Sequence, residues 1–180
     1  MSNSTPGTPT YSTPTIRRRL IGIIYEAFLL IAVEALVLVI FMLVTGNRQT
    51  PGYEHGRQFT LFLATAAYFI HFWTDSGHTL AMKTWRIKLV KPGYARLPIK
   101  VATARFMLAW GWFLPALLVC YVFKLTSKTE VGVAIAVGMA AWACTALFDK
   151  DRQFLHDKLV GTRLISLPKP VKKSKLAAAV

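Results

Sequence analysis

The chain has 180 residues, enough for one domain, and 54% of them are hydrophobic. Soluble domains average roughly 45–50% apolar residues and rarely contain apolar runs of about 20 residues, whereas this sequence contains several. The formal net charge is +14, and every basic residue except Arg105 lies outside the apolar runs. This distribution excludes an ordinary soluble domain, and it favours contact with anionic lipid over binding of nucleic acid.

Residues 1–16 are uncharged and rich in Ser, Thr and Pro, a composition that buries too little apolar surface to fold. We therefore predict a disordered N-terminal tail. The apolar run after the tail is too long for the core of a signal peptide, so we expect it to remain in the protein as a helix.

The first membrane span is predicted over residues 20–44, directly after Arg17, Arg18 and Arg19. As a helix this run is about 37 Å long, more than the roughly 30 Å of bilayer hydrocarbon, so the helix is expected to tilt. The glycine at position 46 predicts its end. The run contains two acids, Glu26 and Glu34, and charged groups inside a membrane are costly enough to suggest a function.

Three further spans are predicted over residues 58–75, 101–123 and 131–148, with residues 46–57 as an exposed loop. Pro115 predicts a kink in the third span. In the fourth span, a spacing of four residues between Gly132, Ala136 and Ala140 predicts close packing against a neighbouring helix.

The segment 76–100 contains six basic residues and no acidic residue. Apolar and basic residues alternate over Trp85–Val90, which favours a strand paired in a hairpin with a segment near Arg96–Ile99. An amphipathic helix over Thr79–Leu89 is the alternative, and the sequence does not decide between them.

Lysine and arginine counts predict the topology. Segments 1–19, 76–100 and 149–180 contain three, six and eight basic residues, whereas segments 46–57 and 124–130 contain two each. Basic loops stay in the cytoplasm, so we predict a multi-pass protein of the inner or plasma membrane with both termini in the cytoplasm.

The arginine inside the third span, Arg105, is predicted to lie at the depth of Glu26, and a paired buried charge costs less than a lone one. We therefore expect a Glu26–Arg105 pair, which either forms part of an ion or proton path or only locks two helices together. Glu34 has no predicted partner.

A polar cluster follows the last span and includes Asp149, His156 and Asp157. A histidine beside an aspartate is compatible with a general base, but no catalytic motif accompanies it. We favour a segment that folds back so that its charges pair with the basic segment 76–100. We expect no enzymatic activity and no cofactor or metal site.

Several of these segments resemble the RDD family of small integral membrane proteins, which is named for one arginine and two aspartates. The similar residues are Arg18-Arg19 followed by Glu26 in place of an aspartate, Gly77 through Lys88, Arg105-Phe106, Phe148-Asp149, His156-Asp157 and Gly161-Thr162. The resemblance implies that Arg18 or Arg19, Glu26 and Asp157 form one cluster. It also implies transport or ion exchange of an unidentified ligand.

We accordingly predict an all-α membrane protein, a bundle of about four transmembrane helices with a short cytoplasmic insertion. The RDD-like domain is expected over residues 17–167 and a basic tail over residues 168–180. Expected partners are anionic lipid at the cytoplasmic face and either a second copy or another membrane protein. The alternative function is a non-catalytic assembly or accessory protein that binds a partner or anionic lipid through its basic face.

Overall fold

Long helices and one small sheet make up the computed structural model, which describes residues 12–46, 50–145 and 153–168. The elements in chain order are α1 (Ile16–Thr45), α2 (Pro51–Asp75), α3 (Leu80–Thr84), β1 (Ile87–Val90), α4 (Ile99–Ala109), the 3-10 helix η1 (Trp110–Phe113), α5 (Leu114–Val122), α6 (Lys128–Cys144), α7 (Leu155–Val160) and β2 (Arg163–Ser166).

Helix α1 begins at Ile16, earlier than predicted, because Thr15 Oγ1 accepts a hydrogen bond from the Arg18 amide at 3.4 Å. The prediction of disorder is therefore wrong for residues 12–16. Pro14 is fully buried, and the Ser12 carbonyl accepts a hydrogen bond from the Ser166 amide at 2.8 Å. Residues 1–11 lie outside the described residues. The helix ends at Gly46 with φ +70°, as predicted.

Helix α2 begins at Pro51, so the predicted loop over residues 46–57 is wrong from that residue onward. Proline suits the first turn of a helix, where its missing N–H has no partner to lose. The amides of Tyr53 and Glu54 donate to the Thr50 carbonyl, which starts the helix despite two glycines in its first turns.

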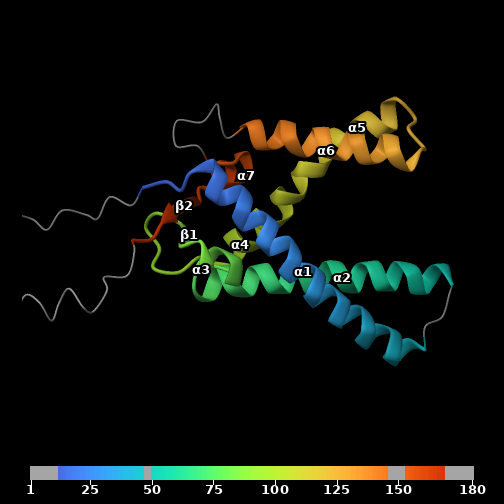
Figure 1. Cartoon of the computed structure of the whole chain (residues 1–180). Coiled ribbons are helices and arrows are strands. Elements are labelled where there is room, and N and C mark those ends of the chain that lie inside the picture. The colour runs from blue at the N-terminus through green and yellow to red at the C-terminus, as the bar shows by residue number, and fades with distance from the viewer. Residues whose placement is uncertain (1–11, 47–49, 146–152, 169–180) are drawn as a thin grey trace, which may run out of the picture.

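The predicted kink in the third span is confirmed. Helix α4 ends at Ala109, η1 follows, and α5 begins one residue before Pro115. Because proline cannot donate to the preceding turn, it is tolerated only near the start of a new helical segment. The segment therefore changes direction between α4 and α5, as Figure 1 shows.

Helix α6 packs against α5 through small residues, but not through those predicted. Gly138 lies so close to Ala116 that a Cβ atom on it would be 3.0 Å from the Ala116 Cβ, and Ala134 is also buried. Gly132 and Ala136 are exposed instead. An alanine-rich helix offers small residues at four-residue spacing on several faces, so the spacing alone could not select one. The predicted end at residue 148 lies outside the described residues.

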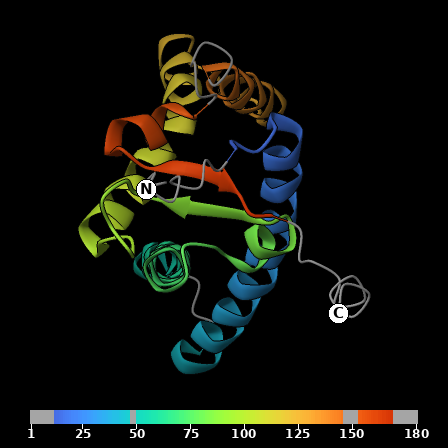
Figure 2. The same cartoon turned by 90° about the vertical axis from the view of Figure 1, so that its left-hand side faces the viewer.

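The basic segment forms both a short helix, α3, and a strand, β1. Strand β1 pairs antiparallel with β2 from the closing segment, with Ile87 opposite Ser166 and Val90 opposite Arg163. The predicted partner near Arg96–Ile99 is therefore wrong, because that stretch contains Pro98, which lacks a ladder donor and instead caps α4. The predicted fold-back of the closing segment occurs through this sheet, which Figure 2 shows among α1, α2, α4 and α7. The predicted charge pairing with segment 76–100 is wrong for Asp157, whose carboxylate pairs with Arg105 of α4 instead.

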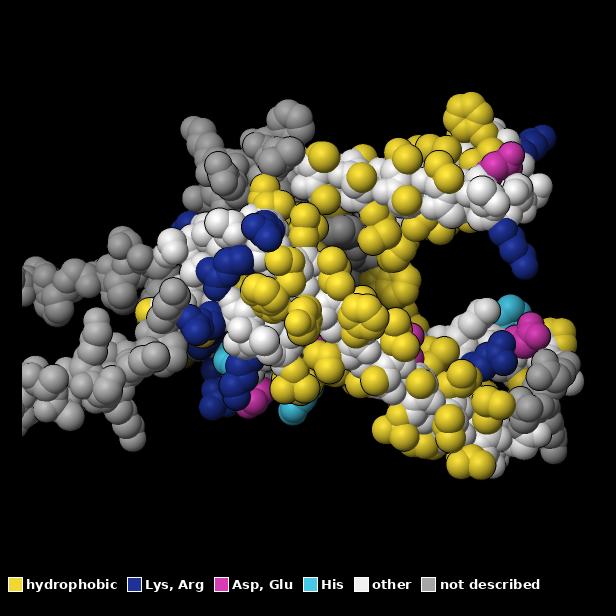
Figure 3. All heavy atoms as spheres, in the orientation of Figure 1, with side chains coloured by type: hydrophobic (Ala, Val, Ile, Leu, Met, Phe, Trp, Pro, Cys, Tyr) yellow, Lys and Arg dark blue, Asp and Glu magenta, His cyan; other side chains and the backbone are white. Residues whose placement is uncertain are grey.

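The long helices form two arms that diverge from a common base, α1 with α2 and α5 with α6 (Figures 1 and 3). Their outer surfaces are covered by hydrophobic side chains, and large residues such as Phe28 and Tyr121 are exposed. The segments Ile16–Thr45 and Ile99–Val122 are long and apolar enough to cross a membrane. The sheet, α3 and α7 lie together at the opposite end of the molecule from the tips of the arms.

Candidate functional site

A cavity of about 350 Å³ lies where the two arms meet. Its walls come from α1, α2, α3, β1, α4, η1, α6 and the closing segment, and most lining side chains are apolar or aromatic. Four lining residues are charged or titratable: Arg19, Glu26, Arg105 and His156. Each of these four is buried, with at most 8% of its surface exposed.

Arg105 projects from α4 toward the closing segment and is held on two sides. Its Nε donates to Asp157 Oδ1 at 2.7 Å, and its guanidinium carbon lies 4.2 Å from the centre of the Trp73 ring. An ion pair combined with a cation–π contact suits a guanidinium group removed from water.

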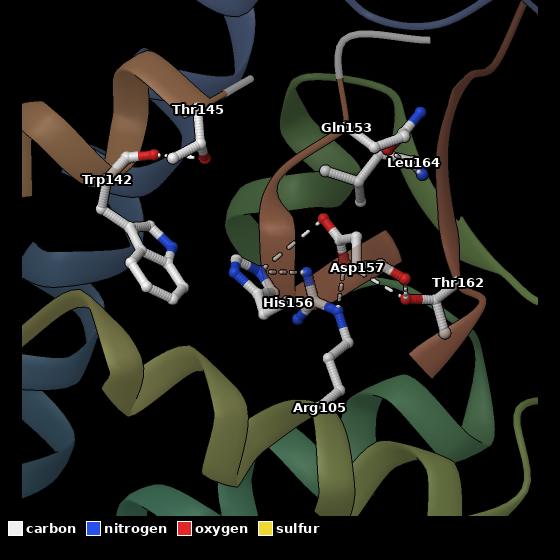
Figure 4. A network of polar contacts seen from close by, with 8 residues as sticks. All are labelled: Arg105, Trp142, Thr145, Gln153, His156, Asp157, Thr162 and Leu164. Carbon is white, nitrogen blue, oxygen red and sulfur yellow. Dashed lines mark hydrogen bonds and ion pairs between the residues drawn. The ribbon is translucent and has the colours of Figure 1, made fainter. Parts of the chain in front are cut away.

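Asp157 is completely buried at the start of α7 (Figure 4). Besides Arg105, its Oδ1 accepts a hydrogen bond from Thr162 Oγ1 at 3.2 Å, and the Thr162 amide donates to the Asp157 carbonyl at 2.9 Å. The intervening Gly161 ends α7 with φ +69°, which allows this return of the chain. Contacts within its own loop therefore hold the Asp157 carboxylate in position, independently of its ion pair with Arg105.

His156 stacks on Phe154 and lies next to the ion pair. The pKa of His156 is lowered to about 4, chiefly because the imidazole is buried; the carboxylate of Asp157 opposes this shift and the charge of Arg105 adds to it. The imidazole is therefore neutral near pH 7. Since arginine can only donate, Arg105 Nη2 donates to His156 Nε2 at 3.4 Å, which places the histidine proton on Nδ1.

Glu26 does not pair with Arg105, so the predicted contact between the first and third spans is wrong. Its carboxylate accepts hydrogen bonds from Tyr68 on α2, at 2.6 Å, and from Thr79 at the start of α3. Arg105 has a closer acid in Asp157, which the closing segment brings beneath the helices. The two predicted partners nevertheless line the same cavity.

Glu34 also accepts a hydrogen bond from α2, because Thr65 Oγ1 donates to its carboxylate at 2.8 Å. The acids of α1 are thus each matched with a hydroxyl group of α2. Thr65 lines the cavity together with Glu26, whereas Glu34 is not a lining residue and contacts α2 through Thr65.

The neighbouring arginines Arg18 and Arg19 point to different places. Arg18 donates to Ser166 Oγ at 3.1 Å and to the Trp85 carbonyl, so it ties α1 to the sheet. Arg19 lies over the Phe154 ring at 5.6 Å and lines the cavity. Asp149, the remaining predicted site residue, lies outside the described residues.

The family model described as RDD family matches residues 13–161. The chain belongs to the RDD family. Its membership identifies it as a membrane protein, in agreement with the two helical segments that are long enough to span. No curated protein and no solved structure matched the chain.

The RDD positions inferred from the sequence come together only in part. Arg19 and Glu26 line the cavity directly, while Asp157 lies one layer behind the lining and holds Arg105 there. Arg18, the alternative first arginine, belongs to the sheet contact instead.

Several residues of the site were not predicted, among them Tyr68, Thr79 and Trp73. Thr79 lies within the RDD-like stretch beginning at Gly77, and its position before a helix was a usable signal for a cap. Tyr68 and Trp73 are aromatic residues in an apolar run, and nothing in that run distinguishes them from ordinary membrane-interface aromatics.

Proposed function

We propose that this RDD protein is a non-catalytic membrane transport or ion-exchange component whose ligand site is the cavity between the arms. The observation that supports the proposal most is the meeting of Arg19, Glu26 and Arg105 on one mostly apolar cavity. Buried charges near a membrane span are costly unless they are paired or functional, and here they line a space that could hold a ligand.

The proposal includes a topology of four spans, with α2 and α6 crossing the cell membrane beside the two segments identified above. Exposed basic residues gather at the end of the molecule that contains the sheet (Figure 3), and this end is placed in the cytoplasm. A reporter fused after Val180 should then be active only in the cytoplasm. Activity on the outer side would contradict the topology.

A flux measurement tests the transport function. The full chain reconstituted in liposomes should move ions when a sodium or pH gradient is applied, and Glu26→Gln should abolish that movement. The matched control is Glu54→Gln, since Glu54 is exposed at the first turn of α2. No flux from folded wild-type protein would contradict transport, whereas flux that persists in Glu26→Gln would contradict the role of Glu26.

A second candidate function rests on the basic end of the molecule. Arg17, Lys83, Arg96, Lys100 and Lys158 are all exposed there and are available to anionic lipid or to an acidic partner. An assembly or accessory protein would use this surface rather than the cavity. Crosslinking from residues 76–100 in native membranes should then recover a defined protein, and recovery of lipid alone would count against this candidate.

A further inference from the structure

The cavity opens toward the bilayer and not toward the basic end. Four residues line it and are also exposed, and so mark its mouth: Ile23 and Ala27 on α1, Trp110 on η1 and Met139 on α6. Ile23 lies four residues beyond Arg19, about 6 Å further along the helix, and therefore already inside the apolar run of α1. A ligand that passes this mouth comes from the lipid.

The cavity is polar at one end and apolar along its length. The lining on α1 begins at Arg19 and continues through Ala27 to Leu30, a rise of about 16 Å. Phe113 and Met139 face this stretch from the other arm. The volume of about 350 Å³ is within the usual range for small-molecule sites, roughly 300–1,000 Å³. This shape suits a chain-like molecule with a polar head.

The polar end favours an anionic head group. The lining contains two guanidinium groups, Arg19 and Arg105, and one carboxylate, Glu26, and the charge of Arg105 is matched by Asp157 behind the lining. The guanidinium groups nevertheless present N–H donors to the cavity, which suit an acceptor head group. Two of the three guanidinium nitrogens of Arg105 are engaged by Asp157 and His156. The third, Nη1, makes no hydrogen bond to any residue within the described ranges, so it remains as a donor.

We infer that the cavity binds a single-chain anionic amphiphile that enters from the bilayer between α1 and α6. Its head accepts a hydrogen bond from Arg105, and its hydrocarbon chain lies along Ala27 and Leu30. A carboxylate and a phosphate monoester share this chemistry, so the source is either a free fatty acid or a lysophospholipid. The inference rests on the proposed function only in taking the cavity as the ligand site.

Photolabelling tests the inference. The full chain in nanodiscs is exposed to a fatty acid that carries a photoreactive diazirine at the end of its chain, and adducts are mapped by mass spectrometry. Adducts are expected on Ala27 and Leu30 of α1 and near Phe113 or Met139. Adducts confined to outward residues such as Phe28 would overturn the inference.

Two matched variants test where the amphiphile binds, and competing ligands test which head group is recognised. Ala27→Trp should fill the cavity and remove most labelling, whereas the same change at Ala32, which is exposed and does not line the cavity, should not. Equal effects of the two changes would contradict the site. Unlabelled palmitate and lysophosphatidic acid are each added as competitors of the photoreactive fatty acid, and the stronger competitor identifies the source of the ligand. Equal competition by a long-chain amine would contradict recognition of the head group by Arg105. If Ala27→Trp does not fold, the positions of the adducts on the wild-type chain and the competition experiments still test the inference.

Binding and transport can fail separately in these measurements. Labelling of the cavity without ion flux would contradict the proposed transport and leave the amphiphile site intact. Ion flux without cavity labelling would contradict the amphiphile and leave transport intact.

Discussion

At the scale of single residues, the ion pair between Arg105 and Asp157 holds the closing segment against α4. Removing one partner of a buried pair leaves an uncompensated charge, which typically costs about 3–5 kcal/mol. Asp157→Ala should therefore lower the stability of the protein in detergent by a similar amount. The control is Lys100→Ala, since Lys100 is exposed on the same helix as Arg105. An equal thermal unfolding temperature for the two variants would contradict the structural role of the pair.

A second prediction at this scale concerns pH. The pKa of His156 is about 4 in the folded protein and near 6.5 in an unfolded chain. The unfolded state therefore binds the extra proton between these values, and the folded state loses stability as the pH falls from 6.5 to 4. The loss is on the order of 3 kcal/mol by the usual conversion of pKa shifts to energy.

The measurement for this prediction is the unfolding temperature against pH for wild type and for His156→Gln, which cannot take up a proton. The wild type should lose stability more steeply than the variant between pH 6.5 and 4. Above pH 6.5 the two curves should run parallel. Identical slopes throughout would show that His156 is not held neutral by burial beside Arg105.

At the scale of elements, the second arm depends on the absence of a side chain at Gly138. A larger residue there meets Ala116 of α5, and overpacking of this kind costs about 1–3 kcal/mol. Gly138→Leu should therefore destabilise the protein in detergent, whereas Gly132→Leu on the same helix should not, because Gly132 has nothing within 4 Å of its Cβ position. Equal destabilisation would mean that α5 and α6 do not pack through this face.

Elements that depend on local signals were predictable, and those that depend on distant partners were not. The end of α1 at Gly46 and the break before Pro115 follow from the backbone limits of glycine and proline. The pairing of β1 with β2 joins residues far apart in the chain, and its alternation is equally compatible with a nearby hairpin. The sequence therefore left a strand and an amphipathic helix open for this segment, and the partner that it suggested for the strand was wrong.

As with the helices and strands, only part of the candidate site could be predicted from the sequence. The cost of burying charge singled out Glu26 and Arg105, and the structure places both in the lining of the same cavity. It could not choose between Glu26 and Asp157 as the partner of Arg105, because depth along a helix does not reveal where a later segment folds back. The hydroxyl donors Tyr68 and Thr79 satisfy Glu26, so no cation was needed beside it.

At the scale of the whole molecule, the two arms and the cavity between them connect the membrane to the charged residues at the base. In the proposed function, a ligand or ion must pass this cavity and not another surface of the protein. Ala27 and Ala32 are both exposed positions of the same helix, but only Ala27 lines the cavity. The same side-chain modification can therefore be made at a position that lines the cavity and at one that does not.

The most direct test is ion flux in liposomes before and after labelling of a single cysteine with a membrane-permeant maleimide. Cys120 and Cys144 are first replaced by serine, and cysteine is then introduced at Ala27 or at Ala32. Labelling, verified by mass spectrometry, should block flux at position 27 and leave it unchanged at position 32. Undiminished flux after complete labelling at position 27 would contradict the account.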